Sequence, residues 1–255
     1  MKSVTYNTTC WEKDWEAMLT TEYIQRNIEF NDYPFAKKVL WINNVEDYSK
    51  VSNAAQKLIE EGVLTHFYKV DDVIEDAMRH FHLSRADNSL GRGFPYSVGP
   101  LCGIYMCDTD WFLHYTGDAT LTEKATRWIP KTMAYMARNE NYKTGNLMWA
   151  RGRSKISWGT LDRESHFQDD DWAVGYGFSD QCFLAETQML KTLDYNMQHK
   201  LSDKRFSKQR KPGTSFEKRI EAWKLNNNFH RVTYKQNFYV HAAELNKVIK
   251  SLRNK

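Results

Sequence analysis

The stretch Gly103-Ile-Tyr-Met-Cys-Asp-Thr-Asp-Trp-Phe-Leu113 carries the pattern on which the fold prediction depends. Its apolar run over residues 104–107 is followed at once by two carboxylates one residue apart, Asp108 and Asp110. A short apolar run is typical of a buried strand, and acids at its end would lie where open α/β sheets bind ligands. Carboxylate oxygens suit Mg²⁺ or Mn²⁺. The pattern therefore predicts a metal site, with ordinary turn chemistry of Asp-Thr-Asp as the alternative.

Upstream of this stretch, predicted strands alternate with predicted helices. Short apolar strands are expected over residues 3–6, 38–42 and 63–70. Apolar residues at helical spacing follow each strand, over about residues 11–30, 51–59 and 73–81. This alternation predicts an α/β fold with a mainly parallel central sheet, flanked by helices and joined by right-handed crossovers. The glycine-rich phosphate loops of dinucleotide-binding and Walker-type proteins are absent from the sequence.

Downstream, loops separate less regular elements. The glycines and prolines of residues 84–100 predict a loop that contains Arg92, either a phosphate contact or a solvated arginine. Ser179 is a good N-cap for a helix with Asp180 in its first turn, either a structural acid or a carboxylate facing an open site. The remaining expectations are a capping box at 120–123, a strand at 145–150, a charged loop at 151–172, a basic loop at 204–213, a helix at 216–223, a strand at 229–240 and a helix at 242–252.

Bulk composition describes a globular protein. The 255 residues are 41% hydrophobic and 27% charged, which is enough to form a core. The net charge of +4 is too small to indicate nucleic-acid binding. Four scattered cysteines without a C-x-x-C pair fit free thiols in a reducing compartment. Without an apolar run of about 18 residues or a signal-peptide core, we expect a cytoplasmic protein with no transmembrane segment, compatible with peripheral membrane contact.

The order of these features resembles the GT-A fold of nucleotide-sugar-dependent glycosyltransferases. Two segments match at the residue level: Asp108-Thr-Asp110, as the Asp-x-Asp (DXD) motif, and Gly177-Phe-Ser-Asp-Gln181. The resemblance implies a single Rossmann-like GT-A domain over residues 1–255. Residues 1–113 would form its nucleotide-sugar-binding half, and residues 114–255 its acceptor-binding half.

The same resemblance implies roles for the acidic and histidine residues. Asp108 and Asp110 would hold Mn²⁺ or Mg²⁺ on the donor diphosphate. His241, in Tyr-Val-His, would match a C-terminal histidine that is a further metal or phosphate ligand, with His230 as the fallback. Asp180 would match the general base of inverting members.

The donor contacts implied by the resemblance lie at strand ends and in one loop. Thr8 and Asn44, at the ends of the first two strands, would meet the base and ribose of the nucleotide. Arg92 would add a fixed cation near the diphosphate. The second strand ends in Asn-Asn-Val-Glu-Asp and so lacks the Asp-rich turn of many inverting members.

The expected activity is metal-dependent transfer of a sugar, as in polysaccharide biosynthesis. The donor would be a UDP- or GDP-sugar and the acceptor a glycan or glycolipid, with no nucleic-acid partner. A metal-dependent phosphoester or pyrophosphate hydrolase is one alternative, since the same acids would activate water. A non-catalytic carbohydrate- or polyanion-binding module is another, supported by the basic residues 204–211.

Overall fold

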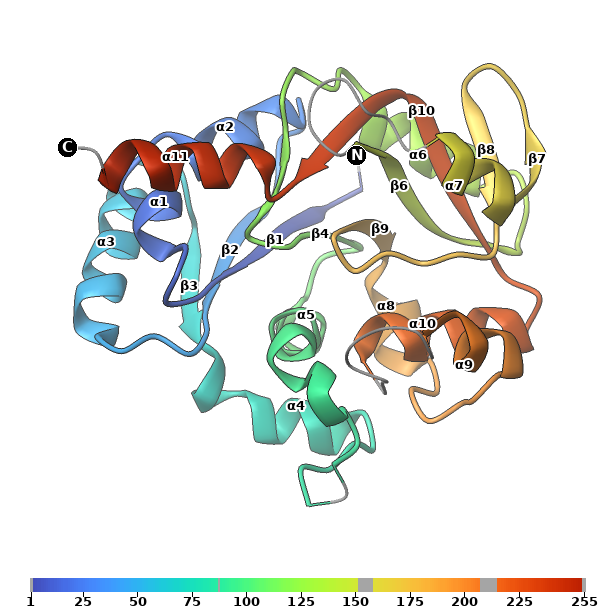
Figure 1. The fold of residues 1–255 in the computed structure, drawn as a ribbon, viewed down its shortest axis with the longest axis horizontal. Helices are drawn as coiled ribbons and strands as arrows, with labels where there is room; N and C mark the ends of the chain where they lie inside the picture. Colours follow the sequence, from blue (N-terminus) through green and yellow to red (C-terminus); the bar gives the residue numbers. More distant parts are fainter. Residues whose placement is uncertain (1, 87, 151–157, 207–214, 254–255) are drawn as a thin grey trace.

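The computed structural model describes residues 2–86, 88–150, 158–206 and 215–253. Within these ranges one mixed sheet of ten strands organises the chain, in the order β3-β2-β1-β4-β9-β6-β10-β8-β7, with β5 paired to β10 (Figure 1). The strands are β1 Val4–Cys10, β2 Lys37–Ile42, β3 His66–Lys69, β4 Trp111–Tyr115, β5 Ala119–Leu121, β6 Tyr142–Ala150, β7 Ser165–Gln168, β8 Trp172–Gly175, β9 Cys182–Glu186 and β10 His230–His241.

Helices cover both faces of this sheet (Figure 1). They are α1 Trp15–Leu19, α2 Tyr23–Phe30, α3 Tyr48–Glu60, α4 Ile74–His80, α5 Phe94–Met106, α6 Trp128–Met136, α7 Trp158–Glu164, α8 Thr187–Thr192, α9 Lys200–Phe206, α10 Phe216–Asn226 and α11 Ala243–Arg253, with short 3-10 turns η1 Val70–Asp72 and η2 Gly91–Gly93. One apolar core lies under α1, α2, α3, α6 and α11. A second lies under α4, α5, α8 and α10.

Strand direction defines the edge of the sheet that matters for function. Strands β3, β2, β1 and β4 are parallel neighbours. Strand β9 runs antiparallel to both β4 and β6, and β6 is parallel to β10. The carboxyl ends of β1, β2, β4, β6 and β10 therefore share one edge, called the carboxyl edge below. This is the α/β architecture predicted from the alternating pattern.

The structure contradicts the prediction for the stretch at residues 103–113. Residues 94–106 form helix α5, so the apolar run before Asp108 is the end of a helix and not a strand. The last part of the predicted loop at 84–100, residues 94–100, is the start of the same helix, with Pro95 in its first turn, where proline is tolerated. Short apolar runs cannot distinguish a buried strand from a buried helix. Gly99 and Gly103 allow α5 to lie directly against Thr9 and Asn7 of β1.

Other elements also differ from expectation. Residues 158–168 of the charged loop expected at 151–172 form α7 and β7, and residues 151–157 lie outside the described ranges. The basic loop expected at 204–213 begins inside α9, and its residues after 206 also lie outside those ranges. Strand β1 continues to Cys10 and does not end at residue 6, so residues 7–9 pair in the sheet. The first part of the predicted helix after Ser179 is strand β9, because its apolar residues pair with β4 and β6 in the sheet, and a helix, α8, begins only at Thr187. Residues 119–121 form β5, and the helix expected after the capping box begins only at Trp128.

Several predicted elements are confirmed. Strand β2 and helix α3 lie where expected, and the Asp47 side chain caps α3 by accepting from the Lys50 backbone N–H. Helix α10, strand β10 and helix α11 also agree with the pattern. The four cysteines are free and buried. Among the described residues, no helix combines the length and apolar character needed to cross a membrane.

Candidate active site

A carboxylate and an imidazole meet at the carboxyl edge of the sheet. Asp118 lies three residues beyond the end of β4, and His241 is the last residue of β10. The backbone N–H of Ala242 donates to the Asp118 carbonyl at 2.7 Å, which holds the two chain segments together. Their side chains then pair, with 3.0 Å between His241 Nε2 and Asp118 Oδ2.

Each partner of this pair favours the charged form of the other. The hydrogen bond to Asp118 raises the pKa of His241 above its ordinary value, against a smaller opposing effect of burial. Partial burial opposes ionisation of Asp118, but the hydrogen bond and charge of His241 outweigh it, and the pKa of Asp118 is lowered. Both side chains remain partly exposed, at 34% for Asp118 and 42% for His241. The pair is therefore accessible to a ligand.

Two further acids follow from this pair: Asp180 lies near it, and Glu217 lies near Asp180. Asp180 is placed by the segment before β9, where the Gln181 carbonyl accepts from the Thr116 N–H at 3.0 Å. Burial raises the pKa of Asp180 to about 6, while the positive charge of His241 partly offsets the effect. Glu217 lies in the first turn of α10, and burial together with the charge of Asp180 raises its pKa well above the ordinary value. Both carboxyls are half-buried.

A cavity of about 590 Å³ opens next to these acids. Its described lining comes from the ends of β6 and β10, the segment before β9, and helices α7, α9, α10 and α11. The charged members are Glu164, Arg205, Glu217, Arg231 and His241. The remaining lining residues are Trp149, Ala150, Phe178, Ser179, Gln181, Tyr239, Ala242, Ala243 and Asn246. The volume lies within the roughly 300–1,000 Å³ typical of small-molecule pockets.

Exposed groups follow β1 and β2 at the same edge. Trp11 directly follows β1, and its backbone N–H donates to Asp14 Oδ1 at 2.7 Å, which fixes the turn. The indole is 41% exposed. Asn44 follows β2 in a left-handed conformation, with φ of 51°, and is exposed. Arg92 is exposed in η2, next to the N-terminus of α5.

Asp108 and Asp110 lie at the opposite edge of the sheet. They precede β4, so they are at its amino end, beside Ser3 and the start of β2. Asp108 pairs with Lys37 Nζ at 2.6 Å, and Asp110 accepts from the Ser3 backbone N–H at 2.8 Å. The structure does not bring either acid to Asp180 or His241. Our expectation that they end a strand is wrong, because the preceding apolar run is helical.

Two other predicted residues are also displaced from the site. Thr8 is only 1% exposed inside β1, because that strand continues to Cys10 and does not end at residue 6 as expected. His230, the alternative to His241, begins β10 and so lies at the far end of the strand. Burial lowers its pKa to about 4, and its ring packs against His166 at a centroid distance of 4.6 Å.

The donor set at the carboxyl edge limits what it can hold. No group of three or more His, Cys, Asp or Glu side chains suited to a metal occurs among the described residues. Asp118 and His241 supply one carboxylate oxygen and one imidazole nitrogen. Mg²⁺ and similar ions often take one or two protein ligands and complete their shell with substrate phosphates and water. The pair therefore fits a divalent cation that arrives together with a diphosphate.

Sequence reasoning missed Asp118 and Glu217, although both had local signals. The run Trp-Phe-Leu-His-Tyr at 111–115 ends in Thr-Gly-Asp118, a strand followed by an acid. Glu217 directly follows the predicted start of a helix whose cap is Ser215. Arg205 falls in the predicted basic loop at 204–213, but no local pattern connects it with Glu164 or Arg231, because these residues are far apart in sequence and meet only in the fold.

Comparison with known proteins supports this view of the fold. No protein-family model and no curated protein sequence matches the chain. Among solved structures, glucosyl-3-phosphoglycerate synthase from Mycobacterium tuberculosis, in complex with Mg²⁺ and uridine diphosphate, aligns with 11% identity and a TM-score of 0.50 over 99% of this chain and 79% of that one. S. aureus TarS 1–349 aligns with 14% identity and a TM-score of 0.50 over 98% of this chain and 65% of that one. Both are GT-A-type glycosyltransferases.

The chain has the GT-A fold. At these identities the likeness extends to the fold and not to the reaction.

Proposed function

We propose that this protein transfers a sugar from a nucleoside-diphosphate donor to a hydroxyl acceptor, with Asp118 and His241 as the ligands of a divalent cation. The observation that carries the proposal is the pairing of these two side chains at the carboxyl edge, 3.0 Å apart and beside a large cavity. Open α/β sheets bind ligands at this edge. The GT-A fold is consistent with the same reaction class.

The donor would lie across the ends of β1, β2 and β4. The mycobacterial neighbour was solved with UDP, which makes a UDP-sugar the donor to test first. The exposed Trp11 indole is suited to stack on the base, in place of the buried Thr8. Asn44 and Arg92 are exposed polar groups near the same edge, suited to the ribose and the phosphates. Residues 1–113 would then supply most of the donor side and residues 114–255 most of the acceptor side.

The cation would be Mn²⁺ or Mg²⁺, as in the neighbouring structures. When bound, it neutralises the charge that builds on the departing diphosphate, an effect worth several kcal/mol. His241 must be neutral to act as a ligand, so cation binding would release its proton. Asp118 would remain ionised throughout, since its pKa is lowered.

Asp180 and Glu217 would handle the proton of the acceptor hydroxyl. Glu217 lines the cavity, and Asp180 lies between Ser179 and Gln181, which also line it. With a pKa of about 6, Asp180 is ionised at neutral pH. A carboxylate in hydrogen-bond reach of the attacking hydroxyl serves as general base. Direct attack assisted by this base would invert the configuration at the transferred carbon. We assign proton acceptance to the two carboxyls as a unit, because interacting acids titrate together.

Ligand-induced stabilisation tests the proposed donor site. We expect UDP to raise the melting temperature only when Mn²⁺ is present, because the diphosphate completes the shell of the cation. A hundredfold excess over Kd should add about 2.7 kcal/mol to the free energy of unfolding. Asp118→Asn should abolish this response.

Asp108→Asn is the matched control, since it removes the same charge at the opposite edge. It should leave the response to UDP and Mn²⁺ intact. If Asp108→Asn abolished the response and Asp118→Asn did not, the proposed cation site would be wrong. Sugar transfer from UDP-sugars to added acceptors, compared with hydrolysis alone, then separates a transferase from a hydrolase.

A further inference from the structure

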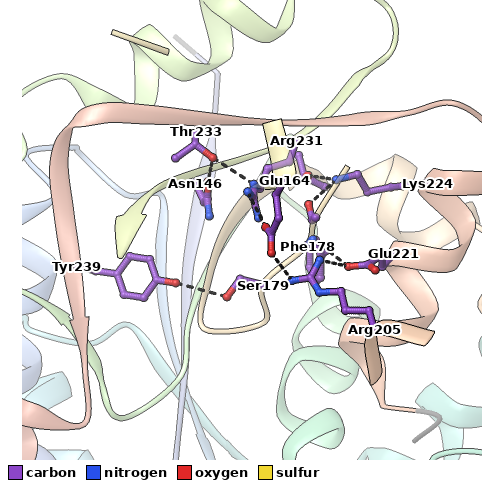
Figure 2. Close-up of polar contacts among 12 residues, drawn as sticks. Asn146, Glu164, Phe178, Ser179, Arg205, Glu221, Lys224, Arg231, Thr233 and Tyr239 are labelled. Carbon is purple, nitrogen blue, oxygen red and sulfur yellow. Dashed lines mark hydrogen bonds and ion pairs between the residues drawn. The ribbon is translucent and has the colours of Figure 1, made fainter. Parts of the chain in front are cut away.

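A chain of alternating charges crosses the wall of the cavity (Figure 2). Glu164 stands between two arginines: its Oε2 lies 3.2 Å from Arg231 Nη2, and its Oε1 lies 3.2 Å from Arg205 Nη2. Arg205 also pairs with Glu221. Two guanidinium groups and two carboxylates therefore neutralise one another in sequence.

Buried hydrogen bonds hold this series of ion pairs in place. Arg231 is 2% exposed, and its Nε donates to Thr233 Oγ1 at 3.1 Å. Thr233 is bonded in turn to Asn146 at 2.7 Å. Glu221 is 3% exposed and accepts from the backbone N–H of Phe178 at 3.4 Å. These contacts restrict how far Arg231 and Glu221 can move when a ligand enters.

Lys224 lies close to these ion pairs but does not add charge to the cavity. Its Nζ donates to Thr144 Oγ1 at 3.1 Å and to the Gly177 carbonyl at 3.0 Å, both neutral groups. Complete burial lowers the pKa of Lys224 well below its ordinary value. The lysine is not among the residues that line the cavity. Among the described lining residues, the cations are therefore Arg205, Arg231 and His241, and each already has a carboxylate partner.

The balance of charge decides which acceptors the cavity tolerates. An incoming phosphate or carboxylate would have to displace Glu164 from two guanidinium groups, or be buried without a counter-charge, and either change costs free energy. An uncharged hydroxyl-rich ring leaves the ion pairs intact, because Glu164 accepts and the arginines donate further hydrogen bonds. Trp149, with the Arg231 guanidinium 5.4 Å from its ring centroid, adds an aromatic surface suited to a sugar ring.

We infer that Glu164 sets the acceptor class: by occupying both Arg205 and Arg231, it makes the cavity selective for an uncharged sugar and against phosphorylated or carboxylated ones. This inference rests on the proposed function, since it assigns the cavity to the acceptor. Glu164 is thereby a specificity-determining residue with no part in proton transfer.

Paired probes test the inference. With UDP and Mn²⁺ present, the methyl glycosides of glucose, galactose, mannose and N-acetylglucosamine are titrated against the full chain, each beside its 6-phosphate and, for the hexoses, its uronic acid. Binding is followed by saturation-transfer NMR and calorimetry. At least one neutral probe should bind about tenfold more tightly than its charged counterparts. Glu164→Gln should reverse this preference, because it removes the carboxylate partner of Arg231 and one of the two carboxylate partners of Arg205.

Two variants keep the test decisive. Glu164→Asp retains the charge and should keep the preference for neutral probes. Glu60→Gln removes an equivalent charge from the exposed end of α3 and should leave binding of all the probes unchanged. Preference of the wild type for charged probes, binding of no probe, or an unchanged preference in a folded Glu164→Gln would each overturn the inference. Binding of UDP with Mn²⁺, measured in the same samples, reports separately on the proposed function.

Discussion

At the scale of single residues, aspartate side chains at the two edges of the sheet differ in their chemistry. Asp108 is 64% exposed and pairs with a lysine on the surface, an arrangement that usually contributes little. Asp180 is half-buried near Asp118 and His241, and its pKa is raised to about 6. Strongly perturbed acids in a cleft are candidates for function, whereas exposed ion pairs are not. The burial and the charges around each aspartate therefore identify candidate functional acids that the Asp-Thr-Asp pattern did not.

The Asp180–Glu217 pair predicts the pH dependence of transfer. The base must be ionised, so kcat/KM at saturating Mn²⁺ should fall as the pH drops below about 6, the pKa of Asp180. Asp180→Asn and Glu217→Gln should each lower kcat by about 10²–10⁴-fold. The measurement is a pH–rate profile for the wild type and both variants.

Asp110→Asn is the control for these variants, because its side chain bonds to Ser3 at the amino edge. It should leave both the rate and the profile unchanged. A wild-type rate that stays constant down to pH 5, or full activity in both variants, would contradict the assignment of the pair as the base.

At the scale of elements, the contact of α5 with β1 places the N-terminal end of the helix at the carboxyl edge. A Cβ atom on Gly99 would collide with Thr9 Oγ1, and one on Gly103 would collide with the Asn7 side chain. Further along, Asn43 Nδ2 donates to the Pro95 carbonyl at 3.1 Å, and the Phe216 N–H donates to Ser97 Oγ at 2.9 Å. Helix α5 thus fixes the end of β2 and the start of α10 relative to each other.

This contact gives a stability prediction. Gly99→Ala should lower the free energy of unfolding by about 1–3 kcal/mol, the usual cost of overpacking. Thr9→Ala removes the atom that the new methyl group meets first, so the double variant should recover part of that loss. Urea denaturation of the two single variants and the double variant measures the coupling. Strictly additive effects would show that the two residues do not meet.

At the scale of the whole molecule, one sheet joins the donor and acceptor sides. Strand β4 pairs with β1 on one side and with β9 on the other. A division after residue 113 would cut β4 and expose both of its neighbours. The two sides of the proposed site are therefore parts of one folding unit and not independent modules.

We accordingly expect thermal unfolding in a single transition. Far-UV circular dichroism and tryptophan fluorescence should give coincident curves, because the tryptophans lie on both sides of β4. A fragment of residues 1–113 should lack stable tertiary structure, as judged by NMR dispersion. Two separated transitions, or a folded fragment, would contradict the single unit.

The amino-acid pattern was sufficient for much of the architecture. Alternating strands and helices predicted the α/β fold, and periodic apolar residues located β2, α3, α10, β10 and α11, because these features depend on local spacing. The resemblance to GT-A glycosyltransferases also singled out Asp180 and His241, which the sheet brings to the same edge. The pattern misassigned residues 104–107, since a four-residue apolar run fits a buried helix as well as a strand.

Strand pairing and packing decided which acids lie at the carboxyl edge and which charged residues meet. Whether an acid faces the ligand edge depends on which end of a parallel strand it follows, and that direction is set by neighbours more than 100 residues apart in sequence, as for β1 and β4. The ionic chain of Glu164, Arg205, Arg231 and Glu221 likewise spans four separate elements. Local spacing carries no information on such encounters, because they form only when the elements pack and bury the charges together.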